Sequence, residues 1–221
     1  MITELADLVV HWADPAGQVP EPTTWMTADE QARWLDAGTH TRAYAQKRWL
    51  LRAAVGAAPG RAIEIRQVCS RCGSRDHGPV AARVVGGAWL HVSLSAHGGY
   101  AAAVADSKWV GVDVVVVEEA ADPALDHALS PDEVRLVRAA PDPVGQRARL
   151  WARKEAVLKA TGRGLQVDPA AVPVLGDEVM LAGVALRVGD RPLIGAPQAV
   201  LAWAHAGHDR RPVHLTTCGR D

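Results

Sequence analysis

The sequence of 221 residues has no phenylalanine and only two tyrosines, so its eight tryptophans must supply most of the aromatic packing. It also has little net charge, −1, which argues against general nucleic-acid binding. No apolar run approaches the length of a membrane span, and the first residues carry acids where a secretory signal carries basic residues. These absences predict a soluble cytoplasmic protein of one or two compact domains that binds neither nucleic acid nor membrane.

Cysteine is scarce as well, with three residues in the chain. Cys69 and Cys72 have the two-residue spacing of zinc ligands, and His77 lies nearby. Because Cys218 is the only further cysteine, a complete metal site would need a distant fourth ligand. We therefore interpret the pair as reduced thiols in a loop between strands, as a cytosolic setting favours.

One segment of the second half combines an acid, a base and an aromatic side chain at helical spacing. Trp151, Glu155 and Lys159 are four residues apart, so a helix would place them on one stripe. Gly162 and Gly164 follow and predict a turn that ends the helix. A carboxylate beside an ammonium suits metal-assisted chemistry on a phosphorylated substrate. The alternative is a solvated ion pair between Glu155 and Lys159 on an amphipathic helix.

About forty residues upstream, a valine-rich run at 110–117 holds a single acid, Asp113. Such a run is typical of a strand that is covered on both faces. An ionised carboxylate is costly there unless a lysine, an arginine or a metal ion accompanies it. The alternative is a hydrated Asp113 at a frayed strand end, which Gly111 would mark.

Together these segments resemble the 4′-phosphopantetheinyl transferases of the surfactin-synthetase type. The resemblance rests on Gly111-Val112-Asp113, on Trp151-x-x-Lys154-Glu155-x-x-x-Lys159 with Gly162 and Gly164, and on Ser93-Leu94-Ser95-Ala96-His97, which lies where the family has Asn-Leu-Ser-His-Ser. It implies transfer of the phosphopantetheine arm of coenzyme A to a serine of an acyl or peptidyl carrier protein, with release of 3′,5′-ADP. The pathways implied are polyketide, nonribosomal peptide and fatty-acid synthesis, and we expect a monomer.

The resemblance also implies a role for each matched residue of the second half. Asp113 and Glu155 would hold a magnesium ion, with the coenzyme A pyrophosphate and waters completing its shell. Glu155, or a water that it holds, would accept the proton of the incoming serine hydroxyl. Lys159 and Lys154 would stabilise the oxygens of the transferring phosphoryl group.

Two positions depart from the family pattern. Val115 stands where many members carry a second acid on the face of Asp113, so we expect weaker magnesium binding rather than lost function. Ala96 stands where the family's histidine contacts the 3′-phosphate of coenzyme A. The adjacent His97 replaces it only after a backbone shift and is otherwise an ordinary loop histidine, whereas Ser95 keeps a hydroxyl for a phosphate.

For the first half, the resemblance implies basic residues that grip the adenosine phosphates. Residues 39–55 are typical of a basic helix in which Arg48 and Arg52 share a face and Trp49 lies on the apolar side. Guanidinium groups suit bidentate phosphate contacts, so Arg48 and Arg52 are the candidates. The alternative is a basic helix face that is simply solvated.

The order of predicted elements is the same in both halves: helices first, then strands. Helices are expected to begin at the capping sequences 27–30 and 130–133, to cover 40–55 and to begin again near 144; strands are expected at 8–12, 62–68, 81–85, 89–94, 100–105, 109–117, 172–175, 179–188, 198–205 and 212–217. The resembled family has two pseudo-symmetric α+β halves, here 1–107 and 108–221, with coenzyme A in the cleft between them. The sequence itself shows no convincing repeat.

Two other functions stay open. The first is a chain of the same fold that binds coenzyme A or a carrier protein without transfer, or that catalyses a different reaction; Val115 and Ala96 favour it. The second is a non-enzymatic scaffold in which Glu155 and Lys159 are merely structural. That interpretation leaves the buried Asp113 unexplained.

Overall fold

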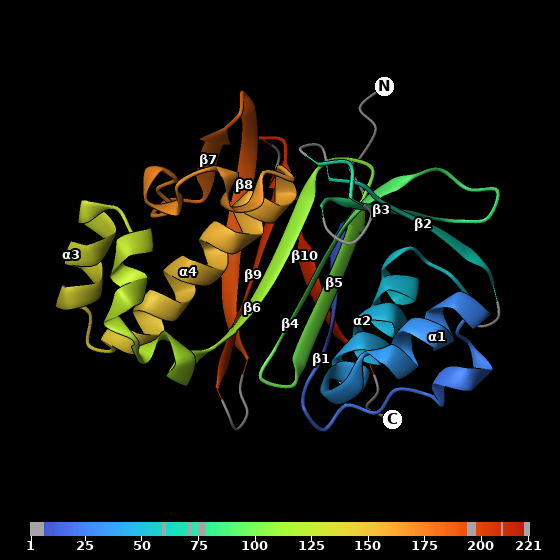
Figure 1. The fold of residues 1–221 in the computed structure, drawn as a ribbon. Coiled ribbons are helices and arrows are strands. Elements are labelled where there is room, and N and C mark those ends of the chain that lie inside the picture. The colour runs from blue at the N-terminus through green and yellow to red at the C-terminus, as the bar shows by residue number, and fades with distance from the viewer. Residues whose placement is uncertain are drawn as a thin grey trace.

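The structure is a computed structural model that describes residues 7–58, 61–69, 72–74, 78–193, 198–208 and 210–218 (Figure 1). It has the mixed α+β fold that the sequence predicts. The strands are β1 (Leu8–Ala13), β2 (Ile63–Gln67), β3 (Val80–Val84), β4 (Leu90–His97), β5 (Tyr100–Asp106), β6 (Val110–Val116), β7 (Glu178–Leu181), β8 (Val184–Leu193), β9 (Ala199–Ala206) and β10 (Val213–Thr217). The helices are α1 (Ala28–Asp36), α2 (Thr41–Ala54), α3 (Pro131–Ala139) and α4 (Pro143–Ala160). None of these helices has both the length and the apolar composition needed to cross a bilayer.

The strands form two sheets, one for most of each half of the chain. The first sheet has the order β10-β1-β5-β4-β3-β2 and the second has the order β6-β9-β8-β7. Neighbouring strands are antiparallel, except that β1 and β10 are parallel. The last strand therefore crosses back to the sheet of the first half. The expected boundary at residue 107 falls between β5 and β6, and the division into two halves stays a prediction.

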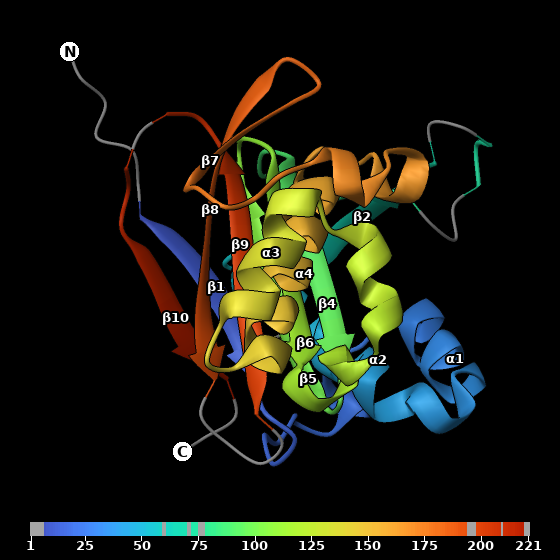
Figure 2. The ribbon, with the colours of Figure 1, turned by 90° about the vertical axis from the view of Figure 1, so that its left-hand side faces the viewer.

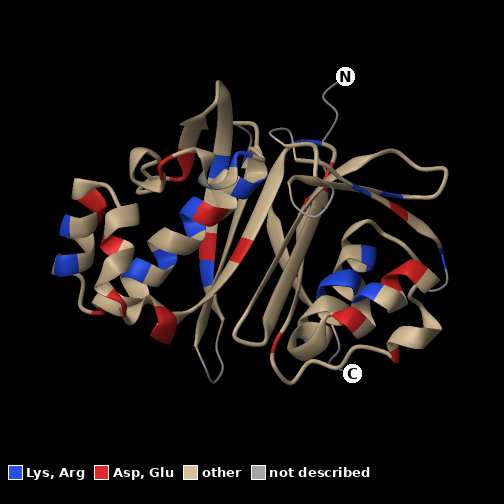
Figure 3. Ribbon diagram, in the orientation of Figure 1, with Lys and Arg blue, Asp and Glu red and all other residues tan. Residues whose placement is uncertain are grey.

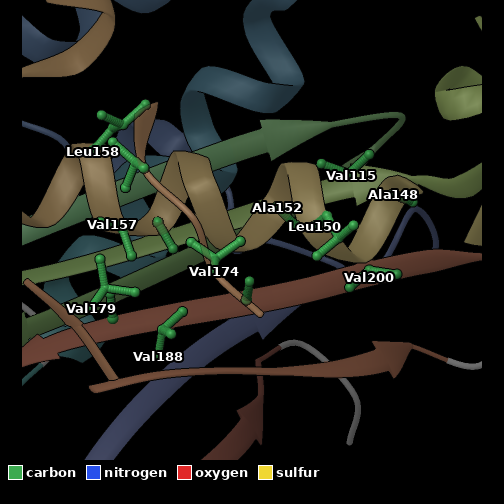
Figure 4. Close-up of a cluster of buried hydrophobic side chains, with 14 of the residues drawn as sticks. Val115, Ala148, Leu150, Ala152, Val157, Leu158, Val174, Val179, Val188 and Val200 are labelled. Carbon is green, nitrogen blue, oxygen red and sulfur yellow. The ribbon is translucent and has the colours of Figure 1, made fainter. Parts of the chain in front are cut away.

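The two sheets lie between two layers of helices (Figures 1 and 2). On one side, α2 buries Leu50 and Leu51 against the first sheet. The sheets meet through apolar residues such as Val104 of β5 and Val112 of β6. On the other side, α4 covers the second sheet, where Ala152 packs with valines of the strands (Figure 4). Every residue of β6 is buried, as its valine-rich sequence predicts.

Side chains of β4 accept hydrogen bonds from backbone N–H groups at the edge of β6. Because β6 ends the second sheet, its N–H groups that point away from β9 need partners from elsewhere. Three alternate β6 residues donate to three alternate β4 side chains: Val112 N to Ser93 Oγ at 3.0 Å, Val114 N to Ser95 Oγ at 3.3 Å and Val116 N to His97 Nδ1 at 3.4 Å. The two halves are thus joined by side-chain hydrogen bonds at the position where a sheet would have a backbone ladder.

Two expectations for the last third of the chain are wrong. Residues 172–175 follow a 3₁₀ turn and are not a strand, and residues 179–188 belong to the hairpin of β7 and β8. The chain reverses at Ala182 and Gly183, whose φ angles of 55° and 77° are both positive, as a two-residue type I′ turn requires. The dipeptide Ala-Gly lacks the Asn or Asp that usually marks this turn. The sequence therefore predicts one continuous strand where the structure has a hairpin.

Candidate active site

The stripe predicted on α4 lies against β6. Glu155 and Lys159 are half-buried, whereas the helix residues between them are all buried. Gly111 of β6 makes this close approach possible, because a Cβ atom there would lie 1.9 Å from the carbonyl oxygen of Ala156. The glycine therefore serves helix packing rather than a frayed strand end, and any larger residue would push α4 away from the strand.

Asp113, Ser95 and Lys159 form one hydrogen-bonded cluster at this contact. Lys159 Nζ lies 2.5 Å from Asp113 Oδ1, and the Ser95 hydroxyl donates to the same oxygen at 2.7 Å. Lys159 Nζ also donates to Ser95 Oγ at 3.3 Å. Asp113 is only 5% exposed, so it is not a hydrated strand end. The buried acid is paired with Lys159, and the cluster draws on β4, β6 and α4 together.

Glu155 lies close enough to this cluster for the charges of Asp113 and Lys159 to shift its pKa. Burial raises the pKa of Glu155, the Asp113 carboxylate raises it further, and the Lys159 ammonium acts in the opposite direction. Among the described residues, none forms an ion pair or a hydrogen bond with the Glu155 carboxylate. Glu155 is therefore a half-buried carboxylate with raised proton affinity and with its oxygens available to a ligand.

A cavity of about 560 Å³ lies beside the cluster. Its wall includes Lys47 and Arg48 of α2, Ser95 of β4 and Lys159 of α4, and no acid is among its described lining residues. Burial lowers the pKa of Lys47, and the charges of Arg48 and Lys159 lower it further. Figure 3 shows that α2 and α4, the two helices that supply these cations, each carry several basic residues. Three cations in one cavity suit a ligand that carries several phosphate charges.

A second cavity, of about 500 Å³, adjoins the first and shares Arg48 and Gln67 with it. Its charged lining residues are Arg33, Arg48, Arg66, Asp29 and Glu30. The guanidinium group of Arg66 also stacks on Trp89, 4.0 Å from the ring centre. The basic surface of the first cavity therefore continues past Arg48 toward α1 and β2.

The assignments of Lys154 and Arg52 to coenzyme A are corrected, because both side chains are buried and paired elsewhere. Lys154 Nζ lies 2.7 Å from Glu133 and donates to two backbone carbonyl oxygens. Arg52 lies 2.8 Å from Glu30. Each of these acids is also the acidic member of the capping box that begins the preceding helix, α3 or α1. The same helix-pair arrangement thus occurs in both halves of the chain.

His97 is not among the described lining residues of the first cavity, and its role toward coenzyme A stays a prediction. Its Nε2 pairs with Glu119, and its Nδ1 accepts a hydrogen bond from the backbone of Val116. Of the predicted coenzyme A residues, the structure brings Arg48 and Ser95 to the cavity. Lys47 also lines it, although no pattern in the sequence distinguishes this lysine.

Neither Cys69 nor Cys72 is among the described lining residues of the two cavities. Cys69 is buried and Cys72 is exposed, while His77 lies outside the described residues. In the described ranges, no group of three or more His, Cys, Asp or Glu side chains is placed to hold a metal ion. A divalent cation at the candidate site would therefore have two carboxylates of this chain, Asp113 and Glu155, as its protein ligands.

The part of the chain that carries these acids also matches a family model. Residues 109–206 match the model of the 4′-phosphopantetheinyl transferase superfamily. This range contains Asp113, Glu155 and Lys159, and it is a little under half of the chain. No curated protein matches the chain.

Similar solved structures include the holo-[acyl-carrier-protein] synthase (AcpS) from Neisseria meningitidis, which is 24% identical with a TM-score of 0.36 over 44% of this chain and 96% of that one. The apo-ACPS structure from Chronobacterium ammoiniagenes is 22% identical with a TM-score of 0.36 over 45% of this chain and 96% of that one.

Proposed function

We propose that this protein transfers the 4′-phosphopantetheine arm of coenzyme A to a serine of an acyl or peptidyl carrier protein and releases 3′,5′-ADP. The observation that carries the proposal is the contact of Asp113 and Lys159, with Glu155 beside them, at the edge of a cavity lined by cations. All three residues fall in the range that matches the transferase superfamily.

The two cavities suit the nucleotide end of coenzyme A. Lys47, Arg48 and Lys159 offer donors to phosphate oxygens, and the cavity has room for a ligand of this kind. The second cavity adds Arg33 and Arg66 on the far side of Arg48. In this arrangement Arg48 is the central phosphate contact, because it borders both cavities.

The donor set of Asp113 and Glu155 fits magnesium. Magnesium prefers oxygen ligands, keeps several waters and is commonly held by one or two carboxylates together with substrate phosphates. When bound, the ion supplies positive charge against the pyrophosphate of coenzyme A. Val115 packs in the core between α4 and the second sheet, so it adds no ligand to this set. We therefore expect weak cation binding in the absence of coenzyme A.

The chain's own groups supply the proton transfer and the positioning. Glu155 accepts the proton of the carrier serine hydroxyl, for which its raised pKa and half-buried position are suited. The serine oxygen forms a bond to the β-phosphorus of coenzyme A, and the bond from that phosphorus to the bridging oxygen breaks, so 3′,5′-ADP leaves. Lys159, at the cavity edge, lies where its ammonium can stabilise the phosphoryl oxygens during this exchange.

The release of 3′,5′-ADP tests the reaction. We expect it to accumulate, as followed by chromatography, when the protein is incubated with coenzyme A, magnesium and an apo carrier protein. We expect none when the carrier serine is replaced by alanine. Binding of coenzyme A without release, across several carrier proteins, would instead support a binding protein of the same fold.

The cationic cavity makes a prediction about substrate affinity. Replacing Lys47 and Arg48 by alanine should raise the KM for coenzyme A by roughly a hundredfold or more, because hydrogen bonds to charged groups contribute about 1.5–3 kcal/mol each. The kcat should change little if these contacts are equally strong in the ground and transition states. Arg138→Ala is the control, since Arg138 is exposed on α3 and lines neither cavity. An unchanged KM in the double variant would place the nucleotide elsewhere.

A further inference from the structure

Lys159 lies between two environments of opposite charge. On one side its ammonium contacts Asp113 and Ser95, and on the other it lines the cavity that also holds Lys47 and Arg48. Its side chain is 30% exposed, whereas that of Asp113 is 8% exposed. The lysine is therefore the more accessible partner of the pair, and it borders a cavity in which an anionic ligand would stabilise its charge.

The charges at the contact favour an exchange of cations. Asp113 and Glu155 are two carboxylates close enough to raise the pKa of Glu155, and Lys159 offsets part of that repulsion. Asp113 Oδ1 already accepts hydrogen bonds from both Lys159 and Ser95. A divalent cation on this carboxylate would stand next to an ammonium, and like charges at such separations repel by kilocalories per mole in a partly buried site. The ammonium and the cation thus compete for the same carboxylate.

We propose that Lys159 is an exchangeable counter-ion of Asp113, which takes the electrostatic place of a divalent cation in the ligand-free protein and moves into the basic cavity when the cation binds. This inference rests on the proposed function, because it takes Asp113 and Glu155 as the cation ligands. Phosphates bound in the cavity would also attract Lys159 away from Asp113, as the divalent cation does by repulsion. Cation binding and phosphate binding therefore strengthen each other, and by linkage the effect is reciprocal.

Binding of Mn²⁺ alone tests this exchange without any turnover. Free Mn²⁺ is counted by electron paramagnetic resonance in titrations of the full chain without coenzyme A. We expect Lys159→Gln to bind Mn²⁺ roughly tenfold more tightly than the unmodified protein, because the competing charge is gone. Lys159→Arg keeps the charge and should bind like the unmodified protein. Lys47→Gln is the matched control: it removes a cation from the same cavity but not from Asp113, so its gain in Mn²⁺ affinity should be clearly smaller than that of Lys159→Gln.

The outcomes separate this inference from the proposed function. Loss of Mn²⁺ binding in Asp113→Asn, with unchanged or weaker binding in Lys159→Gln, would overturn the exchange and leave the metal site in place. Binding that Asp113→Asn does not affect would overturn both. Equal gains in Mn²⁺ affinity for Lys159→Gln and Lys47→Gln would overturn the exchange, because they would show that the affinity depends only on the total charge of the cavity. Circular dichroism checks that each variant is folded, and Lys159→Ala, a second neutral substitution, should show the same gain if Lys159→Gln does not fold.

Discussion

Replacing Glu155 by glutamine is expected to lower the rate of phosphopantetheine transfer about 10³-fold, the loss typical of a removed general base. Glutamine has nearly the same shape but carries no charge, so it neither accepts the serine proton nor holds a cation. Because Glu155 is half-buried and forms no ion pair with the described residues, the variant should unfold at nearly the same temperature as the unmodified protein. Steady-state transfer rates and thermal melts on the same samples check both statements.

The control for this variant is Glu118→Gln, the same chemical change at an exposed acid that follows β6. Its transfer rate should stay within about twofold of the unmodified protein, since surface changes of this kind have small effects. A Glu155→Gln protein that retains a tenth or more of the activity would contradict both roles given to this residue. Because metal binding and proton transfer share one carboxylate, Mn²⁺ titration of the same variant is needed to separate them.

Replacing Lys154 by methionine is expected to lower the free energy of unfolding by about 3–5 kcal/mol, the usual cost of removing one partner of a buried ion pair. Lys154 and Glu133 are both completely buried, and Glu133 also accepts hydrogen bonds from the backbone of Ser130 and Val174. Without the lysine, the carboxylate is buried with no opposite charge. Urea denaturation followed by circular dichroism measures the loss.

Two further variants test the cause of this destabilisation. Lys108→Met makes the same substitution at an exposed position and should change the unfolding free energy by less than about 0.5 kcal/mol. Adding Glu133→Gln to Lys154→Met removes the unpaired charge and keeps the shape of the helix cap, so it should recover part of the loss. A Lys154→Met protein within about 1 kcal/mol of the unmodified one would show that the pair is not structural.

The pair also predicts how the loss depends on pH. Burial acts to raise the pKa of Glu133, but the hydrogen bonds and charge of Lys154 and the backbone donors outweigh it and hold that pKa below its ordinary value. The stability that Glu133 contributes is therefore present above the pKa of an unfolded glutamate and is lost as the pH falls through the lower folded value. The difference between the unmodified protein and Lys154→Met should accordingly shrink as the solution is acidified.

Local sequence signals predicted much of the second half. The capping box at 130–133, the buried β6 and the stripe of Glu155 and Lys159 on α4 are confirmed as structural elements. Each depends on periodicity or on contacts within a few residues, and such patterns can be read along the chain. The pairing of Asp113 with Lys159 joins residues 46 positions apart, and the sequence could say only that the acid needed a partner.

Long-range pairing explains the errors among the basic residues. Arg48 and Arg52 were grouped because they lie four residues apart on α2, yet Arg52 turns to Glu30. The residues of α2 that face the cavity are Tyr44, Lys47 and Arg48, a set with spacings of three and four. Helical spacing defines which residues share a face, but only the packed structure shows which face borders a cavity and which cation meets a buried acid.

The recurrence of one helix-pair arrangement at residues 30–52 and 133–154 could not be detected in the sequence for a related reason. In both halves a buried glutamate caps one helix and pairs with a cation of the next helix, but the cation is Arg52 in the first half and Lys154 in the second. The acids precede their cations by similar distances along the chain. Different residue types fill the same structural position, so a comparison of residue identities does not detect the correspondence.

Intact-mass analysis of an apo carrier protein, after incubation with this protein, coenzyme A and magnesium, shows whether the phosphopantetheine arm is transferred. We expect the carrier protein to gain the mass of one phosphopantetheine arm. The gain over the same incubation time should be strongly reduced with Glu155→Gln and absent with a carrier whose serine is replaced by alanine. No gain across several carrier proteins, with the protein folded and coenzyme A bound, would contradict the transferase and favour a binding role for the same site.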